Sequence, residues 1–130
     1  MPDIPEAPDP SAAAAEAFFA GRPTGLAAYR RVRAALESMG PVEVRVSKSQ
    51  VAFRRRRGFA YLWLPGQYLR APASEVVLSI ALGRAERSRR FKEIVRPSRR
   101  HWMHHLDLRD AGEIDEQVVS WLREAYDRAD

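Results

Sequence analysis

The sequence contains no cysteine, which excludes disulfide bonds, thiolate metal sites and cysteine nucleophiles. No stretch approaches the roughly 20 consecutive apolar residues that a membrane-spanning helix needs. The first six residues, Met-Pro-Asp-Ile-Pro-Glu, are acidic and rich in proline, unlike a signal peptide. We therefore expect a cytoplasmic protein without membrane association.

Common catalytic motifs are also missing. The sequence has no phosphate-binding loop of the form Gly-x-x-x-x-Gly-Lys-Ser/Thr, no Gly-x-Gly-x-x-Gly, no His-Glu-x-x-His and no Gly-x-Ser-x-Gly. The run Ser47-Lys48-Ser49 offers hydroxyls and an amine, but neighbouring residues of a strand point to opposite faces. We expect a protein without enzymatic activity and without a cofactor.

Lysine is scarce, since only Lys48 and Lys92 accompany the arginines among the 22 basic residues. Residues 1–16 hold four acids and no base, residues 107–130 hold eight acids and three arginines, and the stretch between them holds nineteen bases and five acids. Because the planar guanidinium suits phosphate, this cationic middle indicates a polyanion partner. A compositional bias of the genome toward arginine would give the same excess, so both explanations stay open.

The order of apolar residues predicts a flexible acidic tail over residues 1–9 and one domain over residues 10–130. Asp9-Pro10 is a typical start for a helix over residues 11–20, and Thr24 is the expected cap of a second helix that ends at Gly40-Pro41. Asp110 and Glu113 have capping-box spacing at the start of a final helix.

Residues between the second and the last helix alternate with the period of strands. Five strands are expected, over residues 42–46, 51–53, 59–64, 75–82 and 102–108. Strands this close in sequence pair as antiparallel neighbours. The prediction is an α+β fold of order α-α-β-β-β-β-β-α, with the helices packed on one face of the sheet. The expected core includes Leu36, Phe53, Leu106, Val118, Trp121 and Leu122.

Four consecutive arginines, Arg54 to Arg57, lie between two of these strands. They read as the tip of a hairpin in which Gly58 adopts a positive φ. The arginines of such a tip are either simply solvated or form a binding site for phosphate. Phe59, Tyr61 and Trp63 alternate along the next strand and could stack bases on an open face, although aromatic residues usually take the face that helices cover.

A second basic segment, residues 84–100, is expected to be a long surface loop. Together the two segments predict one cationic surface that binds nucleic acid or another polyanion without sequence specificity. The alternative is a protein-interaction or homodimerising module, because both faces of the aromatic strands look apolar. The candidate polyanion-binding residues are Arg54, Arg55, Arg56, Arg57, Arg87, Arg89, Arg90, Lys92, Arg99 and Arg100.

Three histidines invite a metal hypothesis, but their spacing argues against it. On a strand, His101 and His105 share one face and His104 points to the other, so the three cannot meet at one ion. We expect no metal site, a packed His104 and a solvent-facing His105. The acids between Asp107 and Glu116 could attract a hard cation, but capping of the last helix explains them more simply.

Three parts of the chain carry a resemblance to a known family: SKSQVAFRRRRGFAYLW, the pair FKEIV and WMHHLDL, and EIDEQVVSWLREAY. Over roughly residues 26–128 the chain resembles a bacterial family catalogued as domain of unknown function 5655. More distantly it is similar to the YdhG-like iron chaperones and to the MmcQ/YjbR group of small α+β proteins. The resemblance implies a fold, and it implies no activity and no functional residues.

Overall fold

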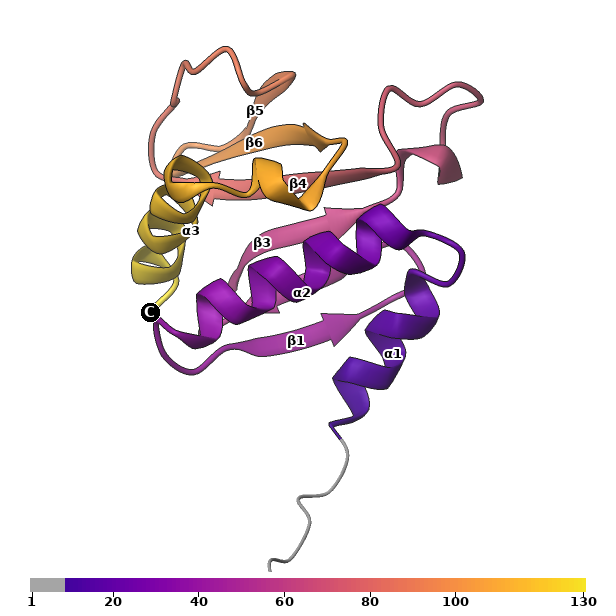
Figure 1. The fold of residues 1–130 in the computed structure, drawn as a ribbon. Coiled ribbons are helices and arrows are strands. Elements are labelled where there is room, and N and C mark those ends of the chain that lie inside the picture. Colours follow the sequence, from indigo (N-terminus) through magenta and orange to yellow (C-terminus); the bar gives the residue numbers. More distant parts are fainter. Residues whose placement is uncertain (1–8) are drawn as a thin grey trace, which may run out of the picture.

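The computed structural model describes residues 9–130 and has helices and strands in the α+β arrangement that was predicted (Figure 1). The helices are α1 (Pro10–Phe18), α2 (Pro23–Glu37) and α3 (Glu116–Arg128), with 3-10 turns η1 (Pro65–Gln67) and η2 (Ala111–Glu113). The strands are β1 (Glu43–Val46), β2 (Val51–Arg54), β3 (Gly58–Trp63), β4 (Val76–Leu82), β5 (Glu93–Ser98) and β6 (His101–Leu108). Residues 1–8 of the predicted tail lie outside the described residues.

All strand pairs are antiparallel, in the order β1-β2-β3-β4-β6-β5. The antiparallel sheet is confirmed, with six strands where about five were predicted, because β5 lies within the segment that was expected to be a loop. This strand is at the edge of the sheet and is mostly exposed, so it shows no alternation of apolar residues. It also contains Pro97, which an edge strand tolerates because one side of its backbone has no ladder partner.

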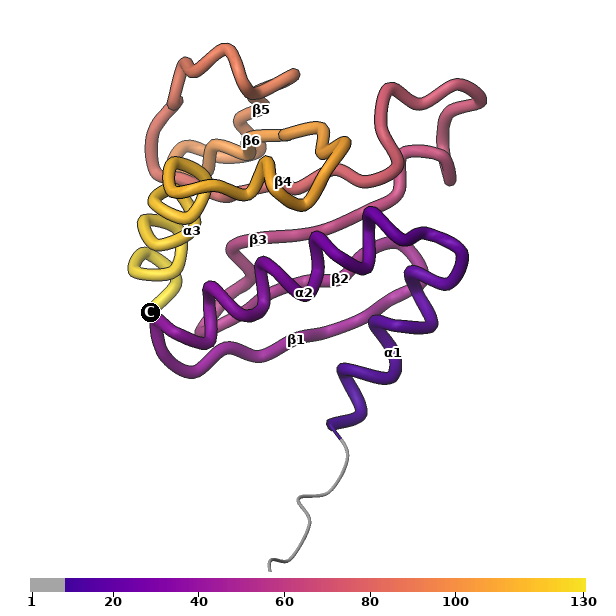
Figure 2. Tube along the Cα trace, in the orientation of Figure 1, coloured from indigo at the N-terminus to yellow at the C-terminus, as the bar shows by residue number. Residues whose placement is uncertain are grey.

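Helices cover one face of the sheet, and the hydrophobic core lies between these two layers. Figures 1 and 2 show α2 running in front of β2, with β3 above it and β1 below it in this view. Tyr29 of α2 stacks on Phe53 of β2, with ring centroids 6.0 Å apart. The six residues predicted for the core are all buried, which confirms that part of the prediction. Among the described residues, no helix has the length and apolar content to cross a bilayer.

Two of the three predicted helix starts need correction. Thr24 does not cap α2; instead Glu75, just before β4, accepts a hydrogen bond from the Gly25 N–H at 2.9 Å. Asp110 and Glu113 do accept backbone N–H groups, but they cap the η2 turn, and Asp115 caps α3 by accepting from Val118 N–H at 3.1 Å. The sequence therefore predicted the capping role of Asp110 and Glu113 correctly but assigned it to the last helix and not to the η2 turn before it.

The turn after β2 differs from the expected hairpin tip. Within residues 9–130, positive φ occurs only at Gly21 and Gly40, so Gly58 does not need it. Gly58 instead makes room for the Tyr61 hydroxyl, which a Cβ at that position would hit. A bulge at this turn sends Phe59 to the helical side, where its ring meets Tyr126 edge-on at 5.7 Å. Phe59 therefore does not share a face with Tyr61, contrary to the prediction.

A substitution at Gly25 tests how tightly the first turn of α2 packs against Phe19. A Cβ at Gly25 would lie 2.5 Å from Cδ1 of Phe19, a side chain that is 1% exposed. Alanine favours a helix by about 1 kcal/mol over glycine, but overpacking costs about 1–3 kcal/mol. Because the Cβ would meet two ring carbons of a fully buried phenylalanine, the cost lies in the upper half of that range, and we expect Gly25→Ala to lower the free energy of unfolding by a net of about 1–2 kcal/mol in urea denaturation.

Gly66→Ala is the matched control. The nearest heavy atom to a Cβ there is 3.8 Å away, so the free energy of unfolding should change by less than about 0.5 kcal/mol. A Gly25→Ala protein as stable as the wild type would contradict the close packing of Phe19 on α2.

Candidate functional site

The face of the sheet opposite the helices carries a groove along the central strand β4. On this face β4 presents only small residues, Val77, Ser79 and Ala81, between larger ones on its neighbours. Tyr61 of β3 pairs with Ser79, and Ser79 pairs with His105 of β6. Small side chains therefore form the floor, and aromatic and other large side chains form the walls.

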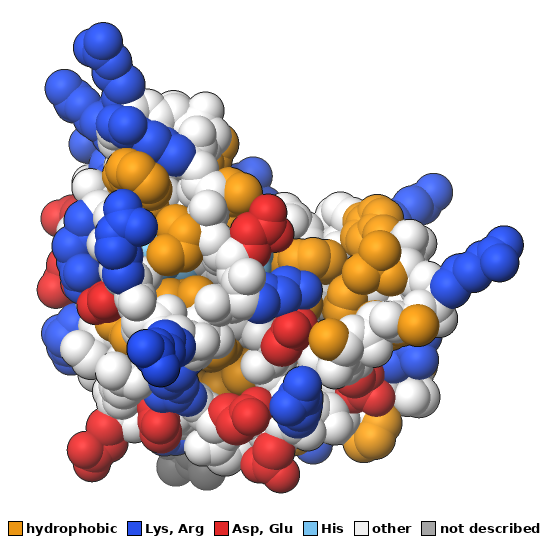
Figure 3. All heavy atoms as spheres, turned by 90° about the horizontal axis from the view of Figure 1, so that it is seen from above, with side chains coloured by type: hydrophobic (Ala, Val, Ile, Leu, Met, Phe, Trp, Pro, Cys, Tyr) orange, Lys and Arg blue, Asp and Glu red, His pale blue; other side chains and the backbone are white. Residues whose placement is uncertain are grey.

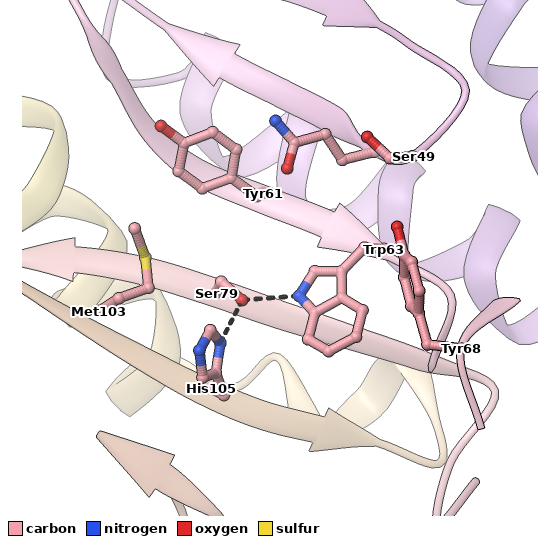
Figure 4. A pocket seen from close by; sticks show the side chains of 8 residues that line it. Ser49, Tyr61, Trp63, Tyr68, Ser79, Met103 and His105 are labelled. Atoms are coloured by element: carbon pink, nitrogen blue, oxygen red, sulfur yellow. Dashed lines mark hydrogen bonds between the residues drawn. The ribbon is translucent and has the colours of Figure 1, made fainter. Parts of the chain in front are cut away.

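Two hollows share this groove. The first encloses about 350 Å³ and is lined by Ser49, Gln50, Tyr61, Trp63, Tyr68, Ser79, Met103 and His105 (Figure 4). Tyr68 reaches it from the loop after η1, with its ring 6.1 Å from that of Trp63. The second, of about 270 Å³, also includes Tyr61 and Met103 and extends to Arg57 and His101. An aromatic end and a basic end thus lie on one continuous surface.

A hydrogen-bonded chain fixes the aromatic end. The Trp63 indole Nε1–H donates to Ser79 Oγ at 2.8 Å, and Ser79 Oγ lies 2.6 Å from His105 Nδ1 (Figure 4). Ser79 Oγ accepts from Trp63 and donates to Nδ1 in the tautomer of His105 that carries its proton on Nε2. Burial lowers the pKa of His105, and nearby Lys92 lowers it further against the opposing effect of Glu93. His105 is half-buried and hydrogen-bonded, so the prediction that it faces solvent was wrong.

His104 lies on the other face and is fully buried, as predicted. Its Nδ1–H donates to the Trp102 carbonyl at 3.0 Å, and its Nε2 accepts from Glu86 N–H at 2.8 Å. Burial lowers the pKa of His104, so the ring is neutral at pH 7. Across residues 9–130, no three histidine or acidic side chains are grouped so as to hold a metal ion.

The arginine block is docked onto the C-terminal end of α3. The Arg55 guanidinium lies 4.1 Å from the centroid of the Tyr126 ring and donates to the Tyr126 carbonyl at 2.9 Å. Arg57 donates to the Arg128 carbonyl at 3.0 Å. The last carbonyls of a helix carry partial negative charge, which cations stabilise. The block is therefore a helix cap in part, a role that neither interpretation of the sequence had considered.

The ten candidate polyanion-binding residues fall into separate groups. The block and the turn between β5 and β6 lie at one end of the sheet, where Arg128 donates to the Arg100 carbonyl at 2.7 Å. Among the described residues, no side chain pairs with the exposed guanidinium groups of Arg56, Arg99 and Arg100. Figure 3 shows basic side chains at the upper left and left of the view and others at the centre, bottom and right edge, with hydrophobic and acidic side chains among them.

The rest of the candidates lie elsewhere. Arg90 is held at the start of α3 by Asp115 at 2.9 Å and by the Glu113 carbonyl at 2.7 Å, and the hydrogen bond from Arg90 is the main reason that the pKa of Asp115 is lowered. Lys92 pairs with Asp107 at 3.2 Å, near the aromatic end of the groove. Arg87 and Arg89 are exposed on the loop between β4 and β5.

Sequence reasoning missed Ser79 and Tyr68. The signal for Ser79 was present in the strand 76–82, because its alternate positions Val77, Ser79 and Ala81 are smaller than the leucines and isoleucine between them. Tyr68 gave no signal, because it lies in a loop whose path depends on packing against Trp63. No local pattern predicts such a contact.

These features define a small α+β domain with one face left open as a groove. A family model described as Domain of unknown function (DUF5655) matches residues 15–129. The chain therefore belongs to this family, as its sequence resemblance predicted. No curated protein and no solved structure matches it. The more distant likeness to the YdhG-like and MmcQ/YjbR groups stays a prediction.

Arg55 and Arg56 make a matched pair for testing the helix cap. Arg55→Gln removes the contact with the Tyr126 ring and the charge-assisted hydrogen bond, so the free energy of unfolding should fall by about 1–3 kcal/mol. Arg56→Gln should change it by less than about 0.5 kcal/mol, because that side chain is exposed. Equal stability of the two variants in urea denaturation would contradict the cap.

The buried His104 and the half-buried His105 predict a pH dependence. Burial lowers the pKa of His104 and His105 in the folded state, so the unfolded chain binds protons first as the pH falls. Stability should therefore decrease from about pH 7.5 to about pH 5.5, a range above the usual titration of carboxylates. His105→Gln should reduce the decrease. Unchanged or higher stability at the lower pH in urea denaturation would show that these rings are not held neutral.

Proposed function

We propose that this protein binds nucleic acid without sequence specificity, along the open face of its sheet and through the arginines at one end of it. The observation that carries this proposal is the groove, which joins aromatic side chains at one end to Arg57 at the other. Aromatic rings stack on bases of any kind, and guanidinium groups bind phosphate through paired donors.

The charges around the groove support a polyanion. Arg54 lies at the same end, on the open face next to Gly58, and its buried Nε has no hydrogen-bond partner within residues 9–130. Arg56, Arg99 and Arg100 are exposed nearby. Burial lowers the pKa of Arg128, and the like charge of Arg57 lowers it further, so the positive charges at this end of the sheet repel one another. A bound phosphate relieves that repulsion.

The function proposed is binding, and not catalysis. Ser79 and His105 have the separation of a nucleophile and its base, but Ser79 lies in the middle of β4 with paired strands on both sides. Its neighbouring backbone N–H groups are used in the sheet and are not available to stabilise an oxyanion. The Ser79 hydroxyl is also 3% exposed and already accepts from Trp63.

A second candidate is a protein partner or a second copy of the chain on the same face. The exposed apolar side chains Tyr68, Leu69 and Val95, which are 62%, 55% and 37% exposed, favour it. Light scattering over a dilution series separates the two. A dimer that persists at high salt and excludes oligonucleotide favours the protein interface, and a monomer favours nucleic-acid binding.

Replacement of Arg56, Arg99 and Arg100 by glutamine tests the proposed function. If these three and Arg57 each contact one phosphate, log affinity should fall with log salt at a slope of roughly −2.8 on single strands and −3.6 on duplex. The triple variant should flatten the slope on single strands by about 2. The measurement is fluorescence anisotropy of a labelled oligonucleotide of mixed sequence at several salt concentrations.

The matched control changes the same charge on the helical side, with Arg22, Arg30 and Arg123 replaced by glutamine. These three side chains are also exposed, and the variant should bind almost as the wild type does. Absence of binding at low salt, or equal weakening by both triple variants, would contradict the proposed interface.

A further inference from the structure

We propose that the hollow between Tyr61, Trp63 and Tyr68 takes one unstacked nucleobase, so that the preferred partner is a single strand. This inference rests on the proposed function and names the ligand of its aromatic end. The hollow of about 350 Å³ is within the range of small-ligand sites, and its walls are mainly aromatic, as such sites are. Ser79 of β4, a small side chain, lies between its walls, which leaves room for a planar ring.

The polar groups of the hollow suit the edge of a base. Ser79 occupies Nδ1 of His105, which leaves Nε2 for a ligand, as a donor in the tautomer that carries its proton there and as an acceptor in the other. The side-chain amide of Gln50, which has no hydrogen-bond partner among the described residues, adds a donor and an acceptor. Every nucleobase presents both kinds of group along its edge. The polar groups of His105 and Gln50 can therefore hydrogen-bond to any nucleobase, which agrees with binding that does not depend on sequence.

Charge favours a base over the cations that aromatic pockets often take. No acidic residue lines the hollow, and the Lys92 ammonium lies 5.5 Å from the centroid of the Trp63 ring. The nearby Asp107 carboxylate is engaged by Ser74 at 2.7 Å and by Lys92 at 3.2 Å. A quaternary ammonium ligand would meet an existing cation without a counter-charge, whereas a neutral base linked to phosphate would not.

The position of the hollow connects it to the arginines. His105 and His101 both face the groove, four residues apart on β6, which corresponds to about 13 Å along the strand. The second hollow shares Tyr61 and Met103 with the first and continues to His101 and Arg57, so the two hollows together cover this distance. A single strand with one base at Trp63 can therefore place following phosphates at the basic end. In a duplex the bases are stacked and paired, and none is available to enter.

The test compares two labelled polymers of equal charge: an oligothymidylate and an abasic deoxyribose-phosphate of the same length. We expect the wild type to bind the oligothymidylate roughly fivefold to 150-fold more tightly, as stacking of one base on an aromatic ring provides. Trp63→Leu should remove this preference and leave the affinity for the abasic polymer and the slope against salt unchanged. Equal binding of both polymers by the wild type overturns the inference while the proposed function stands.

A second pair of variants avoids any change to the packed part of the hollow. Tyr68 and Leu69 are neighbours on one loop and are 62% and 55% exposed. Tyr68→Ala should reduce the preference for the base-containing polymer, and Leu69→Ala should not. Loss of the preference in both variants, or in neither, contradicts the site. If the wild type binds neither polymer, the proposed function and this inference both fail. Binding of choline by the wild type would instead show that the hollow is a cation site and would overturn the inference.

Discussion

Packing of α2 and α3 against the sheet removes one of its two faces from water, and within residues 9–130 no second layer of helices covers the other face. The covered side takes the leucines and isoleucine of β4 together with Phe53, Tyr29 and Trp121. On the open side β4 carries Val77, Ser79 and Ala81, so that face is a groove rather than an apolar surface that would need to be buried. The one-sided arrangement therefore creates the site.

The arginine block joins the fold to this surface. Arg55 is held between the Tyr126 ring and its carbonyl, which stabilises the end of α3 and fixes the turn between β2 and β3. A turn fixed in this way holds Arg56 and Arg57 beside the turn between β5 and β6. In the proposed function, structural and binding roles are divided among adjacent residues of one type, and a polyanion would meet an interface that is already formed.

Much of the fold could be predicted because it depends on residues that are close in sequence. The features that depend on contacts between distant residues could not be predicted. The apolar stripe of α3 placed Val118, Trp121 and Leu122 in the core, because periodicity depends on neighbours in sequence. The cap of α2 by Glu75 and the contact of Arg55 with Tyr126 join residues far apart, so no local pattern indicates them. Edge strand β5 was missed because it buries almost nothing. At the site, the arginines and Trp63 were identified, but Ser79 and Tyr68 needed the pairing of strands and the path of a loop.

The central claim, that the open face binds nucleic acid, can be tested with the three tryptophans. Trp63 lines the groove, Trp102 lies under Arg96 with its ring centroid 4.7 Å from that guanidinium, and Trp121 is 5% exposed in the core. The measurement is a titration of the 15N-labelled protein with a short single-stranded oligonucleotide, following the three indole N–H signals by NMR. We predict a progressive shift of the Trp63 signal and an unchanged Trp121 signal. A Trp63 signal that stays in place while backbone signals of α1 and α2 shift would contradict this account.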